Sequence, residues 1–394
     1  MPEASAGPTR AGTGAGTHDV MHDVVIVGGG PVGLLLACLL AQRGRNVAVL
    51  ERRTGRSGRS RAIGIHPPGL RALGRVGLEA EVRDSGVEIR DGRVTCRGRV
   101  LGSMSFVRAG SVWSLPQLET EAMLERRLID LAPGAVTHGV EVRGLRDLGT
   151  HVEVAGDRGD ETLTLLARYV VGADGVRSGI RDLVDIGWAP KPGRAHYVMG
   201  DTRDDTGEPS TALLHFEPAG VVESFPLPGG RRRWVAWVRR PAREVGASQL
   251  ATIVASRVEG RFDTEAAGEP SVFEARQHLA ERMHRGRVAL AGDAAHEISP
   301  IGGQGMNLGW LDALLLDREL EHAIESGAPY EAFEHYDRTR RASAARAIRQ
   351  AAFNMRMGAP AAGTRLRVRN AAVRALAIPP FRAVLARAFT MRWL

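Results

Sequence analysis

Lysine and cysteine are the scarcest residues in this chain of 394 residues. The two cysteines, Cys38 and Cys96, lie far apart and form no CxxC or CxxH pair. That spacing argues against a zinc site and a disulfide framework, so we expect no bound metal and a reducing, cytoplasmic location. Lys191 is the only lysine among 53 basic residues, and the arginines form no basic stripe interleaved with aromatics. Despite a formal charge of +8, we therefore expect no nucleic-acid partner.

Uninterrupted apolar runs are also missing. The run from Val24 to Ala41 is long enough to mimic a membrane span, but four glycines and one proline interrupt it. We interpret this run as a strand, a turn and a buried helix, and we expect no membrane insertion. Residues 1–21 lack the charged-then-apolar pattern of a secretion signal and are expected to form a flexible tail.

The motif GGGPVG follows a β-branched run and precedes a helical run. In a dinucleotide-binding turn, Gly28 permits the tight bend, Gly30 lets the backbone approach a pyrophosphate, and Gly33 lets the helix pack closely on the strand. Glu51 ends the next predicted strand, where an acid can accept hydrogen bonds from ribose hydroxyls. The motif in this context predicts dinucleotide binding rather than a glycine-rich turn without a ligand.

A second glycine-rich segment, GRVALAGDAAHEISPIGGQGMNLG, begins at Gly286. It predicts a buried strand, Asp293 at its end, a loop, and a helix beginning near Met306. Asp293 can hold a sugar-like hydroxyl, and the loop glycines let backbone amides approach a flat, electron-poor ring. The helix start favours negative charge, such as that of a reduced flavin. One extended cofactor, FAD, explains both glycine-rich segments.

A third segment, YVVGADGVRSGIR, places Asp174 just after a predicted strand. Two interpretations of Asp174 remain open. It can cap the next helix by bonding amides near Arg177, or it can shape a cleft beside the pyrophosphate together with Arg177. His296 has the residue type of a catalytic group, but a structural hydrogen bond is the favoured interpretation.

Together, the three segments resemble the GxGxxG, DG and GD motifs of the group A FAD-dependent aromatic hydroxylases, of the p-hydroxybenzoate hydroxylase type. The likeness extends from about His22 to Met357 and is greatest to actinobacterial enzymes that tailor polyketides and other natural products in antibiotic biosynthesis. The resemblance implies an α/β fold, with a Rossmann-like FAD-binding domain of the GR2 type, an inserted antiparallel-sheet substrate domain and C-terminal helices. Ser299 and the string DREL at Asp317–Leu320 depart from the family pattern, but neither removes an expected ligand.

The resemblance also implies roles for individual residues. The first glycine-rich turn and Glu51 should hold the ADP half of FAD, Arg61 and Asp174 should lie near the pyrophosphate, and Gln117 should lie at the flavin edge. Asp293 should hold the ribityl chain, and the loop after it should border the isoalloxazine. The full set expected to bind FAD is Gly28, Gly30, Pro31, Gly33, Glu51, Arg52, Arg61, Gln117, Asp174, Gly292, Asp293, Pro300, Gly303, Gly305, Met306 and Asn307.

Strand-like pieces joined by Gly and Pro turns occupy residues 195–240, and helical patterns are expected around 243–257 and 273–284. With the resemblance, these patterns predict the domain boundaries. The predicted FAD-binding domain comprises residues 22–86, 109–184 and 275–357, the substrate-binding domain comprises 87–108 and 185–274, and a helical segment comprises 358–394. We expect no thioredoxin-like C-terminal domain, and a monomer or homodimer.

The activity implied by the resemblance is FAD-dependent monooxygenation. NADPH or NADH would reduce the flavin, and O2 would form a C4a-hydroperoxyflavin that hydroxylates a phenolic or polyketide-derived aromatic substrate. Arg52 and Arg53 favour NADPH as the transient cosubstrate. Baeyer–Villiger or epoxidising oxygenation stays open, and so does a flavin-binding protein that sequesters a pathway intermediate without turnover. A flavin halogenase is disfavoured because Trp234 and Trp237 only imitate its Trp-x-Trp string and Lys191 is poorly placed.

The sequence identifies no catalytic base. By residue type and position the candidates are His66, His196, Tyr197 and His215, and a packing or surface role is the alternative for each. Trp234 and Trp237 are expected to pack the sheet rather than to stack on the substrate.

Overall fold

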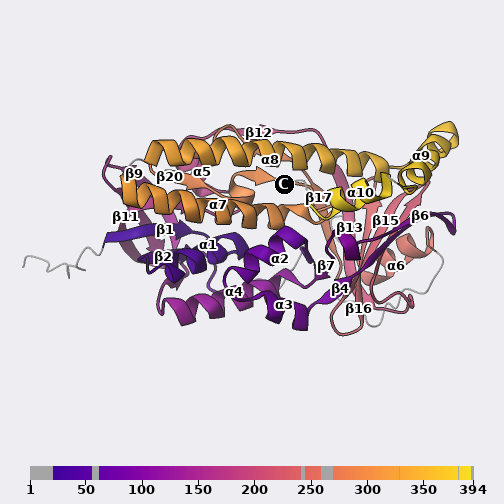
Figure 1. Cartoon of the computed structure of the whole chain (residues 1–394), viewed down its shortest axis with the longest axis horizontal. Helices are drawn as coiled ribbons and strands as arrows, with labels where there is room; N and C mark the ends of the chain where they lie inside the picture. The colour runs from indigo at the N-terminus through magenta and orange to yellow at the C-terminus, as the bar shows by residue number, and fades with distance from the viewer. Residues whose placement is uncertain are drawn as a thin grey trace, which may run out of the picture.

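The structure is a computed structural model that describes residues 21–55, 62–240, 245–258, 269–327, 329–379 and 381–391. Two large sheets lie at opposite ends of an elongated molecule, and the long helix α8 (Pro329–Gly358) extends along both (Figure 1). Within the described residues, no helix is long and apolar enough to cross a membrane.

The first sheet has eight strands and a parallel centre in the order β20-β11-β1-β2-β8. Its central strand β1 is fully buried over Val24–Val27, because helices and neighbouring strands cover it on all sides. Antiparallel strands complete the sheet at its edges. The strands are β1 (Met21–Val27), β2 (Val47–Glu51), β8 (Val136–His138), β9 (Glu141–Asp147), β10 (Val152–Arg158), β11 (Glu161–Gly172), β19 (His284–Arg285) and β20 (Val288–Leu290).

Helix α1 (Pro31–Gln42) begins directly after the first glycine-rich turn and contacts both α4 (Gln117–Leu131) and α7 (Gln304–Ser326). Pro31 occupies its first position, where the missing amide hydrogen costs nothing. Helix α7 in turn contacts α8. The shorter helices nearby are α2 (Pro67–Gly74), α3 (Glu79–Ser85) and α5 (Gly179–Leu183).

The second sheet has seven strands in the order β17-β13-β16-β15-β14-β5-β6. One of its faces packs on α6 (Ala247–Ala255) through Val198, Val222 and Trp234, and the other face turns toward the first sheet. This division follows the alternation of side chains along a strand. The strands are β5 (Asp91–Cys96), β6 (Arg99–Ser105), β13 (Ala195–Arg203), β14 (Thr211–Glu217), β15 (Gly220–Leu227), β16 (Arg231–Val238) and β17 (Ser271–Ala275).

Two three-stranded sheets and two short 3-10 helices complete the part of the chain that the structure describes. The first small sheet joins β3 (Gly64–Ile65), β4 (Val87–Ile89) and β7 (Val112–Ser114). The second joins β12 (Trp188–Pro190), β18 (His278–Ala280) and β21 (His296–Glu297). The 3-10 helices are η1 (Val107–Ala109) and η2 (Gly292–Ala294).

The expected fold class is confirmed, with two local corrections. The helix expected at 273–284 is wrong, because this stretch forms β17, β18 and β19. Pairing of β17 with β13, which makes β17 the edge strand of the second sheet, overrides the helix-favouring composition of the segment. The inserted sheet is also not wholly antiparallel, since β5 runs parallel to β14. The predicted domain boundaries remain a proposal.

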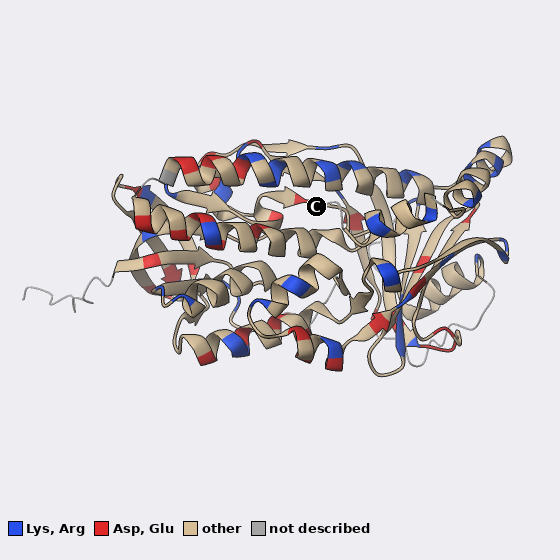
Figure 2. Ribbon diagram, in the orientation of Figure 1, with Lys and Arg blue, Asp and Glu red and all other residues tan. Residues whose placement is uncertain are grey.

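The C-terminal helices α9 (Gly363–Leu376) and α10 (Phe381–Phe389) dock on the second sheet. From Arg338 onward the sequence contains no Asp or Glu, and Figure 2 shows the resulting blue segments along α8, α9 and α10. Apolar contacts hold these basic helices in place. Phe389 stacks on Phe106 at 5.0 Å between ring centroids, and Leu366 packs in a cluster with Leu101.

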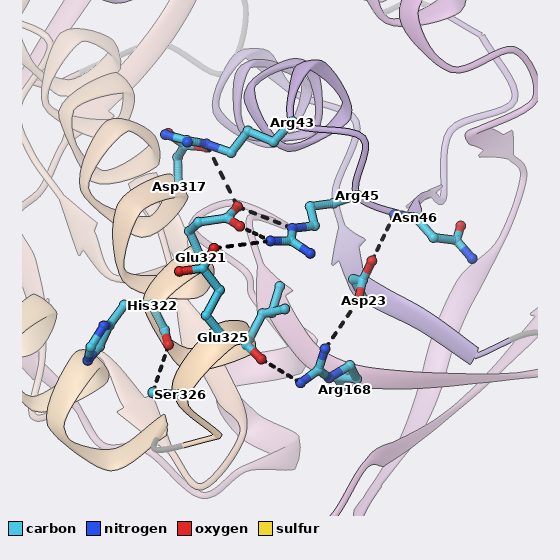
Figure 3. Close-up of polar contacts among 11 residues, drawn as sticks. Asp23, Arg43, Arg45, Asn46, Arg168, Asp317, Glu321, His322, Glu325 and Ser326 are labelled. Carbon is cyan, nitrogen blue, oxygen red and sulfur yellow. Dashed lines mark hydrogen bonds and ion pairs between the residues drawn. The ribbon is translucent and has the colours of Figure 1, made fainter.

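A cluster of ion pairs ties the end of α1 to α7 (Figure 3). Asp317, which is nearly buried, accepts two hydrogen bonds of 2.8 Å from Arg43. Arg45 pairs with Glu321 one turn further along α7 and lies 3.8 Å from the exposed carboxylate of Glu325. The unusual DREL string thus supplies a carboxylate that holds two helices of the cofactor domain together.

Replacing Asp317 by alanine should lower the free energy of unfolding by about 1–2 kcal/mol, because a bidentate, partly buried pair is lost. Glu325→Ala is the matched control. Its carboxylate is 69% exposed, so the expected change is below about 0.5 kcal/mol. Urea unfolding of the two variants measures the difference, and equal effects would contradict a specific role for the Asp317–Arg43 pair.

Candidate functional site

One continuous cavity of about 740 Å³ connects the two sheets. It starts at the first glycine-rich turn, passes the ends of β11 and β20, and reaches the inner face of the second sheet. Twelve of the residues expected to bind FAD line it. They are Gly28, Gly30, Pro31, Glu51, Arg52, Gln117, Asp174, Asp293, Pro300, Gly303, Gly305 and Met306. Segments far apart in sequence therefore meet along one elongated space.

Three of the expected residues that the structure describes do not line the cavity. Gly33, Gly292 and Asn307 lie behind it and shape the backbone that does line it. Asn307, for example, donates hydrogen bonds of 2.9 Å to the carbonyl oxygens of Gly64 and Gly303 and fixes the start of α7. Arg61 falls outside the described residues.

The glycines of the first turn have two distinct functions. At Gly28, with φ of +116°, an added Cβ would lie 2.3 Å from the carbonyl oxygen of Ala173. At Gly33 it would lie 2.1 Å from the carbonyl oxygen of Gly28. The fold itself therefore requires both glycines. At Gly30 an added Cβ would meet no atom within 4 Å, so open space lies between this residue and the cavity at the start of α1.

Glu51 closes the cavity at the end of β2 and is almost completely buried. Its carboxylate accepts hydrogen bonds from the backbone amides of Gly29, at 2.7 Å, and Arg53, at 2.8 Å. Burial acts to raise the pKa of this carboxyl, but the hydrogen bonds from Arg53 and Gly29 hold the pKa below its usual value. Glu51 is thus an ionised acceptor, suited to ribose hydroxyls, whose geometry is fixed by Arg53.

Asp174 contacts the helix that follows it and also lines the cavity. One carboxylate oxygen accepts a hydrogen bond of 3.1 Å from the amide of Ile180 in α5, while Ser178 is the N-cap residue of that helix. The other oxygen, Oδ1, is buried and has no hydrogen-bond partner within the described residues.

The loop that carries Asp293 is held by a buried charge cluster around Asp312 of α7. Asp312 accepts hydrogen bonds from Gly292 N (2.9 Å), His296 Nε2 (2.6 Å) and Arg340 Nε (2.6 Å). Burial acts to raise the pKa of Asp312, but the charges of His296 and Arg340 hold it below its usual value. His296 does not line the cavity, in agreement with the structural interpretation of this histidine.

At the far end, the inner face of the second sheet forms an apolar wall opposite the loop at 300–303. We call this part of the cavity the sheet chamber, and its apolar wall consists of Met199, Ala212, Phe225, Val235 and Phe273. Arg233 also lines it and is held by Asp201 through hydrogen bonds of 2.7 and 2.8 Å. Arrangements of this kind bind apolar ligands with few polar contacts.

Sequence reasoning missed Glu223, which lines the sheet chamber from β15. Its side chain is 5% exposed, and burial raises its pKa to about 7. The available signal was a single charged residue inside the apolar strand GVVESFPL, which is buried along nearly its whole length. Phe389 was also missed. It reaches the cavity from α10, and no local pattern indicated that contact.

Of the four candidate bases, only His66 lines the cavity. Its Nε2 lies 3.1 Å from the carbonyl oxygen of Gly302, and burial lowers its pKa to about 4, so it is neutral at pH 7. His196 lies 3.5 Å from Glu274, and Tyr197 is buried against Phe273.

His215 is the fourth candidate and bonds the hydroxyl of Thr95 at 2.8 Å, away from the cavity. Trp234 donates to Thr202 and packs against α6, which supports its packing role. The geometry therefore favours none of His196, Tyr197 or His215 as a base.

Replacing Gly30 by valine tests the ligand space at the first turn. Gly30 has φ of −83° and ψ of −179°, which valine also adopts, and no protein atom of the described residues lies within 4 Å of an added Cβ. We expect the apoprotein to melt within about 2 °C of wild type, while FAD affinity falls about 100-fold or more. Flavin fluorescence titration measures this affinity. If the FAD affinity is unchanged, the pyrophosphate does not bind next to Gly30.

The burial of His66 and His215 predicts that the folded protein loses stability in acid. Burial lowers the pKa of both to about 4, from the 6.5 of an exposed histidine. Between pH 6.5 and 4 the unfolded chain binds more protons, so the free energy of unfolding falls as the pH falls, by up to about 3 kcal/mol per histidine. His215→Asn should flatten this dependence in urea unfolding at several pH values. Identical slopes in variant and wild type would disprove the assignment.

Comparison with known proteins identifies the family. The FAD binding domain family matches residues 21–351. The anhydrotetracycline monooxygenase of Streptomyces rimosus is 32% identical over 349 residues, which are 83% of this chain and 68% of that protein. The dialkyldecalin synthase of Streptomyces rugosporus is 30% identical over 345 residues, covering 82% of this chain and 70% of that protein.

The fold comparison agrees with the sequence comparison. The solved structure of the anhydrotetracycline hydroxylase of Streptomyces rimosus superposes with a TM-score of 0.78 and 27% identity, over 94% of this chain and 76% of that one. This chain therefore spans about two thirds to three quarters of the length of these relatives. The match over most of the chain, together with the cavity that joins the glycine-rich turns, shows that the chain belongs to the FAD binding domain family of flavin-dependent monooxygenases.

Proposed function

We propose that the protein hydroxylates a phenolic or polyketide-derived aromatic substrate, with FAD as cofactor and NAD(P)H and O2 as cosubstrates. The observation that carries this proposal is the single cavity, which joins a dinucleotide-type turn to the apolar sheet chamber. When bound, FAD supplies the reduction of O2 and the transfer of one oxygen atom. The relatives named for anhydrotetracycline support a fused-ring phenolic substrate.

The residues that would hold FAD follow from the geometry of the cavity. The open space at Gly30 and the start of α1 suits the pyrophosphate, and Glu51 suits the ribose of the ADP half. Asp174 lines the middle of the cavity, and its buried Oδ1 has no hydrogen-bond partner within the described residues. Asp293, after the end of β20, lines the cavity, which supports its proposed contact with the ribityl chain.

The loop from Pro300 to Met306 is the proposed seat of the isoalloxazine. Gly303 has φ of +66° as the N-cap residue of α7, a conformation that exposes backbone amides without steric cost. The 23-residue helix α7 directs its N-terminus toward this loop. Amides and helix dipole together favour negative charge on a bound ring.

The side chains of the sheet chamber are also proposed to exclude water from the oxygen atom that is transferred. Met199, Phe225, Val235 and Phe273 form a wall without hydrogen-bonding groups, and Ile301 and Met355 pack on the same face of the sheet. A dry chamber protects a reactive oxygen donor from decay to peroxide. The same wall can enclose a flat aromatic substrate.

One relative favours a second candidate function. The dialkyldecalin synthase is named for ring formation, so this fold also occurs in a protein whose name states no oxygen transfer. This supports the alternative in which the chain binds FAD and a pathway intermediate without oxidising it. Baeyer–Villiger or epoxidising oxygenation is the nearer alternative. Lys191 does not line the cavity within the described residues, which disfavours the halogenase interpretation.

Other features of the proposal follow from the sequence. NADPH is the proposed reductant, because Arg52 and Arg53 line the cavity near the ribose end. A reducing cytoplasm is the proposed location, and both cysteines are buried and not paired with each other. A monomer or homodimer is the proposed state.

Oxidation of NADPH by the purified, FAD-loaded protein tests the function. With anhydrotetracycline or a related phenolic polyketide we expect at least about tenfold stimulation of NADPH oxidation, because bound substrate supplies the transition-state contacts. Mass spectrometry should show a product heavier by one oxygen atom. Gly30→Val is the control without bound FAD. A yellow protein that binds the substrate but shows no stimulated oxidation would favour the sequestering function instead.

A further inference from the structure

The surroundings of Glu223 are set by the register of the second sheet. Glu223 lies opposite Val235 of β16, which lies opposite Met199 of β13. Residues two apart on a strand share a face, so Phe225 points the same way. All four side chains line the cavity. A carboxyl group is therefore set among apolar side chains in the wall of the sheet chamber, and Arg233 is the other charged residue on this face.

Glu223 has no hydrogen-bond or ion-pair partner within the described residues. A buried polar group without a partner destabilises a folded protein, and an apolar side chain would pack better at such a position. The fold gains nothing from a carboxyl here. A group that is kept at a cost to stability inside a ligand cavity is expected to find its partner in the ligand.

The charged and titratable groups around Glu223 leave it without a matching cation. Arg233 on β16 is engaged by Asp201 on β13. Tyr197, also on β13, is buried and does not line the cavity, and its electrostatic interaction with Glu223 raises the pKa of Tyr197 further. His66, on the cofactor side of the cavity, is neutral at pH 7. A carboxylate on the substrate would be repelled here, whereas a neutral hydrogen-bond donor would be bound.

We propose that Glu223 accepts a hydrogen bond from a phenolic or enolic hydroxyl of the substrate and takes its proton during oxygen transfer. This inference rests on the proposed function and narrows its substrate class to a hydroxyarene or enol without a carboxylate at that position. It also makes Glu223 the group that orients the ring against the loop at 300–303.

The proton step balances without an additional reactant. The substrate O–H bond breaks, the proton moves to a carboxylate oxygen of Glu223, and the electron pair stays on the substrate oxygen. Conjugation of that pair into the ring raises the electron density at the ortho and para carbons, which attack the electrophilic oxygen that the proposed activity supplies. Because burial raises the pKa of Glu223 to about 7, the carboxyl can both accept and release the proton near neutral pH.

Binding of 4-methylphenol and of its methyl ether, 4-methylanisole, to the FAD-loaded protein tests the hydroxyl contact alone. The change in flavin absorption, without NAD(P)H, reports both affinities. Wild type should bind the phenol about tenfold more tightly than the ether, the value of one good hydrogen bond to a charged group. Glu223→Leu should abolish this preference and should melt at or above the wild-type temperature.

Glu217→Gln is the matched control. Glu217 is also 5% exposed and lies on β14 of the same sheet, but it accepts a hydrogen bond of 2.8 Å from the amide of Arg97 and does not line the cavity. This variant should keep the tenfold preference. Equal preference for the phenol in wild type and Glu223→Leu would overturn the inference.

Glu223→Gln separates orientation from proton transfer, because glutamine still accepts a hydrogen bond but takes no proton. With any phenol that wild type hydroxylates, this variant should bind normally, lower kcat about 100-fold and lose the limb of the pH profile near pH 7. An unchanged profile would overturn the proton-transfer role. The binding test needs neither NAD(P)H nor O2, so failure of the proposed oxygenation would remain distinguishable from failure of this inference.

Discussion

The close approach of three strand ends in the first sheet is the constraint on which the whole site depends. The amide of Ala173 donates to the carbonyl of Val27 at 2.8 Å, and the amide of Ala291 donates to the carbonyl of Gly172 at 2.9 Å. These bonds bring the turn after β1, the turn after β11 and the loop after β20 to the same edge. Only glycine at position 28 permits that contact, since a Cβ would overlap the backbone of Ala173. Carboxyl ends of parallel strands gather ligands in this manner wherever such a sheet is open at its edge.

A second, buried constraint extends this arrangement to the far half of the cavity. Asp312 joins α7, α8 and the Asp293 loop through three hydrogen bonds at zero exposure. An ionised group in such a place is stabilised by His296 and Arg340, and removing both would leave a buried charge uncompensated. The loop that borders the proposed flavin seat is therefore held from behind, by residues that never reach the cavity. Rigid support of this kind keeps ligand-facing backbone in position when the pocket itself is apolar.

The cofactor half of the site could be predicted from sequence, because local motifs carry it. Gly28, Gly30, Asp174 and Asp293 each sit at a strand end, and strand ends can be located from short apolar runs. The sheet chamber could not be predicted, since its wall is assembled by strand register, and the chain alone does not state which residues of β13, β15 and β16 face one another. Phe389 illustrates the same limit, for its place depends on how α10 docks far from the motifs. The helix predicted at 273–284 was wrong for a related reason. Pairing of β17 with β13 outweighed the helical propensity of the segment.

The two halves of the cavity differ in how their polar groups are used, and this difference has a consequence for specificity. At the ADP end, Glu51 is fixed by Gly29 and Arg53, so a substitution there would disturb both the ligand and the backbone turn. In the sheet chamber the wall residues alternate along strands whose outer face packs separately on α6. A change at Met199 or Phe225 can therefore alter the ligand space and leave the outer core intact. Relatives near 30% identity carry names as different as an anhydrotetracycline monooxygenase and a dialkyldecalin synthase. In this fold, backbone packing constrains the cofactor end of the cavity, whereas only side-chain volume constrains the substrate end. Relatives can therefore keep the cofactor site and differ in the reaction for which they are named.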